Sequence, residues 1–259
     1  MGVQTPPLTT AEAIAAGWKE HPNGCSTATD AFDKWLLVDR DQRAFMSVGL
    51  TAGAKALDAL WAQAEDECRY SEEGDAHVSR YHDLAQGLWP QDYEWFLLTS
   101  VLRDAVSAYE VYLENAMERV LESHGLGRTK ADRAPSWWEH LDFFKKVMGV
   151  DPKPSEVERI VNLRNLLTHR RGELRTKADR EEFGRNADND PDVGGLDFFP
   201  DRVVSMTPAR TTAYLDTLGS AVRSVDPVVW AHSYGRHRVP ALLALRSKGH
   251  ASDYPGDRE

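Results

Sequence analysis

The chain has 259 residues, of which 41% are hydrophobic and 28% charged, the balance of a globular protein long enough to bury a core. Its formal net charge of −10 argues against a general nucleic-acid binder, which usually presents a basic surface. No apolar run approaches the ~18 residues of a membrane span and no signal-peptide pattern opens the chain, so we expect a cytoplasmic protein that does not contact membranes.

The residues 1–88 are expected to form an N-terminal helical extension whose role the sequence does not indicate. Its main element is a long helix from about Asp39 to Cys68, with an apolar side. Gly49 and Gly53 interrupt that pattern, so either a continuous or a broken helix is compatible with it. The stretch that follows, up to Pro90, is mixed and predicts no regular element.

The clearest periodicity runs from Gln91 to His124. Apolar residues recur there at spacings of three and four, which predicts an amphipathic helix packed along its length. Pro90 precedes this segment and Gly125 follows it, as helix punctuation requires. The apolar positions are Leu98, Leu102, Ala105, Tyr109, Tyr112, Ala116 and Val120.

Two shorter helices are predicted next, at 137–149 and from Ser155 to His169 or Arg170. Each begins with a serine followed three residues later by glutamate, the pattern of a capping box. Gly172 is the expected terminator of the second helix.

A long polar connection, residues 173–206, is predicted to contain one short extended piece at 202–205. The last strong helix then runs from 207 and ends before Pro227, and the tail 231–259 is expected to be partly disordered. Four good helices and almost no strand predict an all-α helical bundle.

One short motif carries the chemistry, Arg164-Asn165-Leu166-Leu167-Thr168-His169. On a helix at 100° per residue, Arg164, Asn165 and His169 lie on one side, and Asn165 and His169 are about 6 Å apart along the axis. A guanidinium binds phosphate, and an imidazole exchanges a proton near neutral pH. These are the parts that cleavage of a phosphodiester bond needs.

The spacing resembles the signature of the HEPN superfamily: arginine, then a polar residue, then histidine after a gap of four to six residues. The resemblance extends to Arg170-Arg171-Gly172 and to the order of helices, with the motif on the third of four. It covers roughly residues 90 to 230, so we expect a HEPN-like bundle at 89–230.

The resemblance implies a metal-independent endoribonuclease that needs no cofactor. In such enzymes the motifs of two chains converge across a homodimer interface, so His169 would act as acid or base, Arg164 as phosphate clamp, and Asn165 as an orienting group. Members of this kind commonly act in toxin–antitoxin or antiviral defence systems and are often restrained by a protein partner. RNA is therefore the expected substrate, and an antitoxin or regulatory protein is a further expected partner.

The basic residues around the motif predict the contacts to RNA. Six of them lie between Arg159 and Lys177 against one acidic residue, and we expect Arg170, Arg171 and Arg175 to bind the backbone. The alternative is that these cations are favoured by the negative end of the helix dipole.

Two residues are expected to support the site. Thr168 flanks the histidine, and Glu110 is a polar position near the middle of the long helix, where it would orient His169 or pair with Arg164. The alternative for Glu110 is an ordinary solvated face. For His169 and Arg164 the alternatives are a histidine bonded to the last helix carbonyls and an ion pair with a neighbouring helix.

Other site types find little support. Cys25 and Cys68 belong to no metal-binding cluster, so we expect reduced thiols and no metal site.

The acidic total charge leaves a rival function open, a non-catalytic HEPN-like module that binds RNA, nucleotide or protein without cutting. A purely structural helical protein is the third reading.

Overall fold

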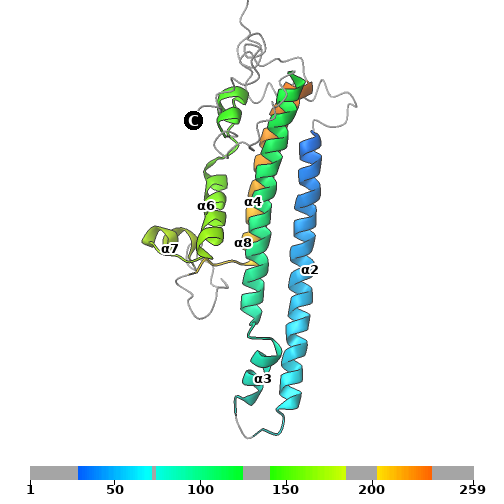
Figure 1. The fold of residues 1–259 in the computed structure, drawn as a ribbon, viewed down its shortest axis with the longest axis vertical. Coiled ribbons are helices and arrows are strands. Elements are labelled where there is room, and N and C mark those ends of the chain that lie inside the picture. The colour runs from blue at the N-terminus through cyan, green and yellow to red at the C-terminus, as the bar shows by residue number, and fades with distance from the viewer. Residues whose placement is uncertain (1–28, 72–73, 125–140, 185–202, 235–259) are drawn as a thin grey trace, which may run out of the picture. The chain divides into compact units, whose positions relative to one another are not determined.

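The computed structural model describes residues 29–71, 74–124, 141–184 and 203–234, and it confirms the predicted all-α helical bundle. Within these ranges the single non-helical pairing is an isolated antiparallel bridge between Glu173 and Val203. Figure 1 shows the elements: α2 (Asp30–Glu67), α3 (Ala76–Leu84), α4 (Pro90–Ser123), the π-helical turn η1 (Phe143–Met148), α6 (Ser155–Arg170), α7 (Lys177–Phe183) and α8 (Pro208–Tyr234). None of these helices has the length and hydropathy that a membrane span requires.

Contacts divide the chain into two compact units, and each contains segments of α2, α4, α6 and α8. The described parts of unit 1 are 29–39, 107–124, 141–158 and 216–234; those of unit 2 are 40–71, 74–106, 159–184 and 203–215. The domain boundaries predicted near residues 88 and 230 stay predictions. The stretch before residue 29, the start of the helix predicted at 137–149 and the tail from 235 lie outside the described residues.

The helix α2 is continuous, and it begins nine residues before the predicted start at Asp39. Both glycines inside it allow α4 to approach closely. A Cβ added to Gly49 would lie 2.9 Å from a Leu97 methyl carbon, and one added to Gly53 would lie 2.0 Å from the Tyr93 ring. The Tyr93 hydroxyl also donates a hydrogen bond to the Gly49 carbonyl, at 2.8 Å. The glycines therefore serve packing and do not break the helix.

The short helix α3 in unit 2 was not predicted. It lies against the C-terminal part of α2 through aromatic rings, with Tyr81 buried between Trp61 and Trp89 at centroid separations of 5.1 and 5.4 Å. Leu57 and Ala64 of α2 complete this cluster. A nine-residue helix is marginal by itself, so contacts far apart in the sequence stabilise it.

A buried polar network joins three elements in unit 1. Asp226 of α8 is 2% exposed and accepts hydrogen bonds from the Thr29 amide (2.9 Å), the Thr29 hydroxyl (2.5 Å) and the Tyr112 hydroxyl (3.2 Å). The Thr29 hydroxyl oxygen in turn accepts from the Phe32 amide at 3.2 Å, which caps the start of α2. Hydrogen bonds to the Asp226 carboxylate thus join the start of α2 and the middle of α4 to α8.

Burial raises the pKa of Asp226 to about 6, although the donors from Thr29 and Tyr112 oppose that shift. The folded protein therefore binds this proton more tightly than the unfolded chain does. The stability that protonation contributes is complete below pH ~4 and is lost as the pH rises through about 6.

We expect the unfolding free energy of the wild type, relative to Asp226→Asn, to fall by about 1.5 kcal/mol between pH 5 and pH 7.5. Urea unfolding of both proteins at several pH values measures this difference, because titrating groups that do not interact with residue 226 contribute equally to both. A difference that stays constant with pH would contradict the assignment.

The helix α8 continues through Pro227 to Tyr234, so the predicted end before Pro227 is wrong. A proline inside a helix removes one hydrogen bond and costs about 3 kcal/mol. The four residues that follow it, Val228, Val229, Trp230 and Ala231, are all buried. Burial of these side chains offsets that cost, at roughly 1.5–3 kcal/mol for each large one.

Candidate functional site

The motif occupies the last two turns of α6, and its two sides differ as predicted. The side opposite the motif is buried, with exposed fractions of 8% or less at Ile160, Leu163, Leu166 and Leu167. On the motif side, Arg164 and Asn165 are half-buried, whereas Thr168 and His169 are exposed. The imidazole is therefore open to a substrate, while the arginine and the asparagine lie closer to the protein body.

The end of α6 is fixed by two residues with left-handed backbone. Arg171 has φ 52° and Gly172 has φ 80°. The Gly172 amide donates back to the Leu166 carbonyl of the helix at 3.3 Å. Gly172 is thus the helix terminator that the sequence predicts, three residues after His169.

Two more residues of unit 2 hold this helix end, Trp95 of α4 and Val204. A Cβ added to Gly172 would lie 2.8 Å from the Trp95 ring, so the indole packs directly on the Gly172 backbone. The indole Nε1 donates to the Val204 carbonyl at 2.8 Å, and the Val204 amide donates to the Gly172 carbonyl at 2.8 Å. We call Trp95, Gly172 and Val204 the clasp. It fixes the helix end that carries His169.

The helix α7 lies in the segment predicted as a polar connection, and it covers one flank of α6 (Figure 1). Thr176 and Asp179 form a full capping box at its start. Arg159 of α6 stacks over the Phe183 ring at 5.8 Å and donates to the Glu182 carbonyl at 2.7 Å. A cation–π contact and a hydrogen bond thus join the two helices.

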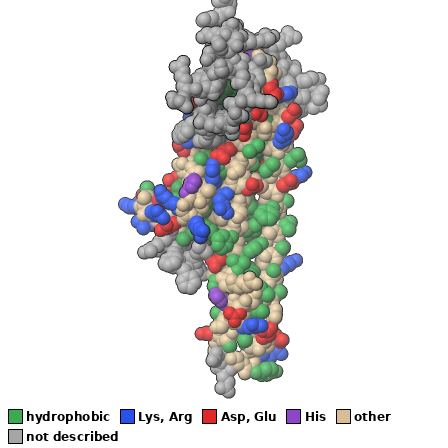
Figure 2. Space-filling model, viewed as in Figure 1, with side chains coloured by type: hydrophobic (Ala, Val, Ile, Leu, Met, Phe, Trp, Pro, Cys, Tyr) green, Lys and Arg blue, Asp and Glu red, His purple; other side chains and the backbone are tan. Residues whose placement is uncertain are grey.

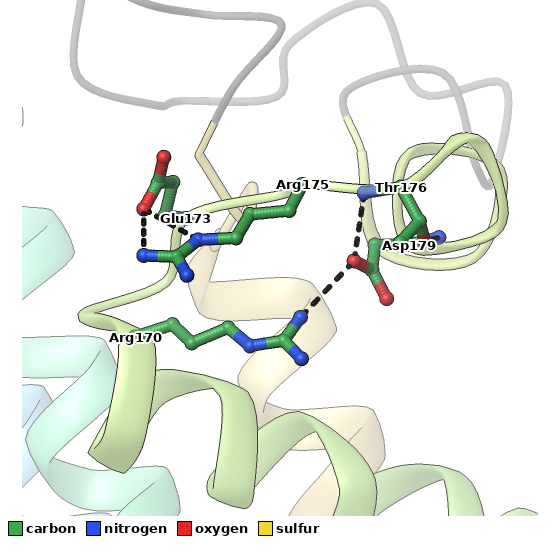
Figure 3. Close-up of polar contacts among 5 residues, drawn as sticks. All are labelled: Arg170, Glu173, Arg175, Thr176 and Asp179. Atoms are coloured by element: carbon green, nitrogen blue, oxygen red, sulfur yellow. Dashed lines mark hydrogen bonds and ion pairs between the residues drawn. The ribbon is translucent and has the colours of Figure 1, made fainter.

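Two of the three arginines predicted to bind RNA are paired with carboxylates. Arg170 lies 3.4 Å from an Asp179 oxygen, and Arg175 lies 2.9 Å from Glu173. Figure 3 shows the two guanidinium groups drawn to opposite sides by these partners. Hydrogen bonds from Thr176 hold the pKa of Asp179 below its usual range, which keeps its charge. Arg171 is exposed at the turn after α6.

Comparisons of the chain with protein-family models, with curated proteins and with solved structures find no match.

The surface around the motif is less positive than the sequence between Arg159 and Lys177 suggested. Because α7 folds against α6, its charges join those of the motif helix. From Arg159 to Phe183 there are seven basic and four acidic residues, a net of +3. Figure 2 shows Lys, Arg and His side chains beside red carboxylates over α6 and α7. The site is a mildly basic surface on an acidic protein, suited to a short stretch of phosphate backbone.

Glu110 was predicted to support the site. It is half-buried on α4 and belongs to unit 1, whereas the motif belongs to unit 2, so its role stays a prediction. Unit 1 contains a cavity of about 410 Å³ between the start of α6 and α8. Glu156 and Asp216 give this cavity an acidic lining that suits no phosphate, and it contains none of the predicted site residues.

Sequence reasoning missed Trp95 and Asp179 as residues of this region. The pattern Thr176-x-x-Asp179 is a readable capping signal, and it would have placed α7 and its carboxylate. Nothing in the local sequence connects Trp95 to Gly172, because that contact depends on how α4 and α6 pack.

Proposed function

We propose that the chain is a HEPN-type endoribonuclease that cleaves RNA without a metal ion, through Arg164, Asn165 and His169. One observation supports this most: an exposed imidazole one helical turn from a half-buried carboxamide and guanidinium, on a helix end held by long-range contacts. Catalytic groups need this kind of support, since small displacements are costly in rate.

The reaction uses the nucleophile that RNA carries. A base removes the proton of a 2′-hydroxyl, the 2′-oxygen attacks the adjacent phosphorus, and the bond from phosphorus to the 5′-oxygen breaks. An acid delivers a proton to that leaving oxygen, which yields a 2′,3′-cyclic phosphate and a 5′-hydroxyl. His169 supplies acid or base, Arg164 stabilises the charge on the phosphoryl oxygens, and Asn165 orients the histidine or the substrate.

One histidine per chain suffices when two chains contribute to one composite site, as the HEPN resemblance implies. A homodimer would then provide both proton-transfer groups. Arg170, Arg171 and Arg175 would bind the RNA backbone beside the site, because exposed ion pairs contribute little and exchange readily for phosphate. Such an enzyme fits a toxin or antiviral defence role under control of a protein partner.

Labelled RNA incubated with the purified protein in excess EDTA tests the proposal. We expect cleavage within single strands or loops, at a rate that the chelator does not change, and products that end in cyclic phosphate. Products with 3′-hydroxyl ends, or activity abolished by EDTA, would contradict it.

A second candidate is a non-catalytic module that binds RNA, nucleotide or protein. The net charge of −10 favours this alternative, because an RNA-processing enzyme more often presents a basic surface. It predicts retained RNA or nucleotide binding and no cleavage by the wild type.

A further inference from the structure

Phe96 of α4 is a large aromatic side chain that unit 2 leaves exposed beside the candidate site. It is 53% exposed, and its ring meets the Trp95 ring edge-on at a centroid separation of 5.3 Å. Trp95 is buried and packs on Gly172, which follows His169 by three residues. Phe96 is therefore one ring removed from the helix end that carries the imidazole.

Phe96 lies on the same side of unit 2 as Thr168 and Arg164. The start of α4 and the end of α6 run in opposite directions (Figure 1), and Trp95 and Leu167 lie against the same glycine of the clasp. In an antiparallel pair, one step forward from two facing residues turns both side chains to the same side. The step from Trp95 reaches Phe96. The step from Leu167 reaches Thr168, and Arg164 lies one turn before it.

The charges on this side of α4 favour a polyanion in one direction from the ring. Arg103 is exposed, and it lies seven residues after Phe96, which places it on the same stripe of the helix. The next residue, Asp104, accepts a hydrogen bond from Gln42 at 2.8 Å, so its carboxylate is turned toward α2. Asp92 lies one turn before Phe96 and is half-buried. A phosphate backbone is therefore favoured from Phe96 toward Arg103 and disfavoured toward Asp92.

Figure 2 shows the Lys, Arg and His side chains over α6 and the hydrophobic side chains over α4 and α2 on one face. Single-stranded RNA is bound by this combination of groups, cations for the backbone and exposed aromatic rings on which bases stack. Unpaired bases can be splayed out onto a ring, whereas the bases of a duplex are already stacked on one another.

We propose that Phe96 is the stacking surface for an unpaired base that flanks the scissile phosphate, with Arg103 beside the backbone of that strand. This inference rests on the proposed function, and it names single-stranded RNA as the substrate that the site selects. Stacking tolerates every base, so little sequence preference is expected at this position. His169 lies one step further round α6 than Thr168, so a base on Phe96 leaves the imidazole accessible.

Binding of a single-stranded RNA oligonucleotide with methylated 2′-hydroxyls, which cannot be cleaved, tests the stacking. Fluorescence anisotropy is expected to show about 5- to 100-fold weaker binding by Phe96→Ala, the usual effect of losing one stacked base. Phe96→Trp should retain the affinity, whereas Phe96→Leu should not, because leucine keeps apolar area but has no π-face. Tyr70→Ala, at an aromatic residue that is 92% exposed beyond the end of α2, is the control and should bind as the wild type does.

A labelled RNA with one mapped cleavage site tests where the base lies. An abasic ribonucleotide is placed in turn at each position that flanks the cut. At one of these positions it should lower the rate of cleavage by the wild type about 5- to 100-fold. The same RNA should be cut no more slowly than the parent RNA by Phe96→Ala, because the ring and the base form one interaction. Arg103→Ala should reduce the salt dependence of binding.

The results separate the subsite from the nuclease. Ring-dependent RNA binding with no cleavage by the wild type would retain the subsite and overturn the nuclease in favour of the non-catalytic module. Cleavage that ignores both Phe96→Ala and the abasic positions would retain the nuclease and overturn the subsite. So would full affinity in Phe96→Leu, since the ring would then belong with exposed Phe45 and Val48 to an apolar surface for a protein. A chain that neither binds nor cuts RNA overturns both.

Discussion

Replacement of His169 by alanine is expected to reduce the rate of RNA cleavage by about 10²- to 10⁴-fold, the usual contribution of a general acid or base. His169 is exposed and its side chain faces away from the buried side of α6, so the variant should fold as the wild type does. Initial rates on a labelled RNA, with circular dichroism and unfolding curves for both proteins, measure the effect. His82→Ala, at an exposed histidine of α3, is the matched control and should cleave at the wild-type rate.

The companion change Arg164→Ala separates charge stabilisation from proton transfer. Loss of the guanidinium should lower the cleavage rate, and Arg164→Lys should restore part of it, because an ammonium keeps the charge without the planar fork. Arg69→Ala, at an exposed arginine in the turn after α2, should have no effect. Equal cutting by wild type, His169→Ala and Arg164→Ala would assign the activity to another site or to a contaminant.

The elements that the sequence predicted best are those whose signals are local. The apolar repeat of α4 and the termination of α6 at Gly172 both follow from side-chain spacing and backbone preference. The two-sided character of the motif helix was predicted for the same reason. The apolar repeat of α4 and the two sides of the motif helix rest on the 3.6-residue period, which does not depend on the rest of the fold.

The elements that the sequence did not predict depend on distant contacts. The helix α3 is stabilised by stacking of Tyr81 between Trp61 and Trp89, and α8 continues past Pro227 because the residues beyond it are buried. Local propensity argues against helix in both places. The same limit applies to the candidate site, where Asp179, the partner of Arg170, comes from α7 and its approach to α6.

Gly172→Ala is expected to destabilise the protein by about 2–4 kcal/mol. Roughly 1 kcal/mol or more comes from left-handed backbone at φ 80°, which a Cβ disfavours. A further 1–3 kcal/mol comes from overpacking, because the new Cβ would lie 2.8 Å from the Trp95 ring. Urea unfolding of the two proteins gives the difference. The clasp would loosen at the helix end that carries His169, so cleavage should fall even where the variant is folded.

Gly149→Ala separates the two causes. Gly149 also has left-handed backbone, at φ 69°, but a Cβ added there meets no atom within 4 Å. Its replacement should therefore cost about 1 kcal/mol, the backbone strain alone. If the two variants lost equal stability, the close packing of Trp95 on Gly172 would carry no energy. Full RNA cleavage by a folded Gly172→Ala protein would show that the clasp does not position His169.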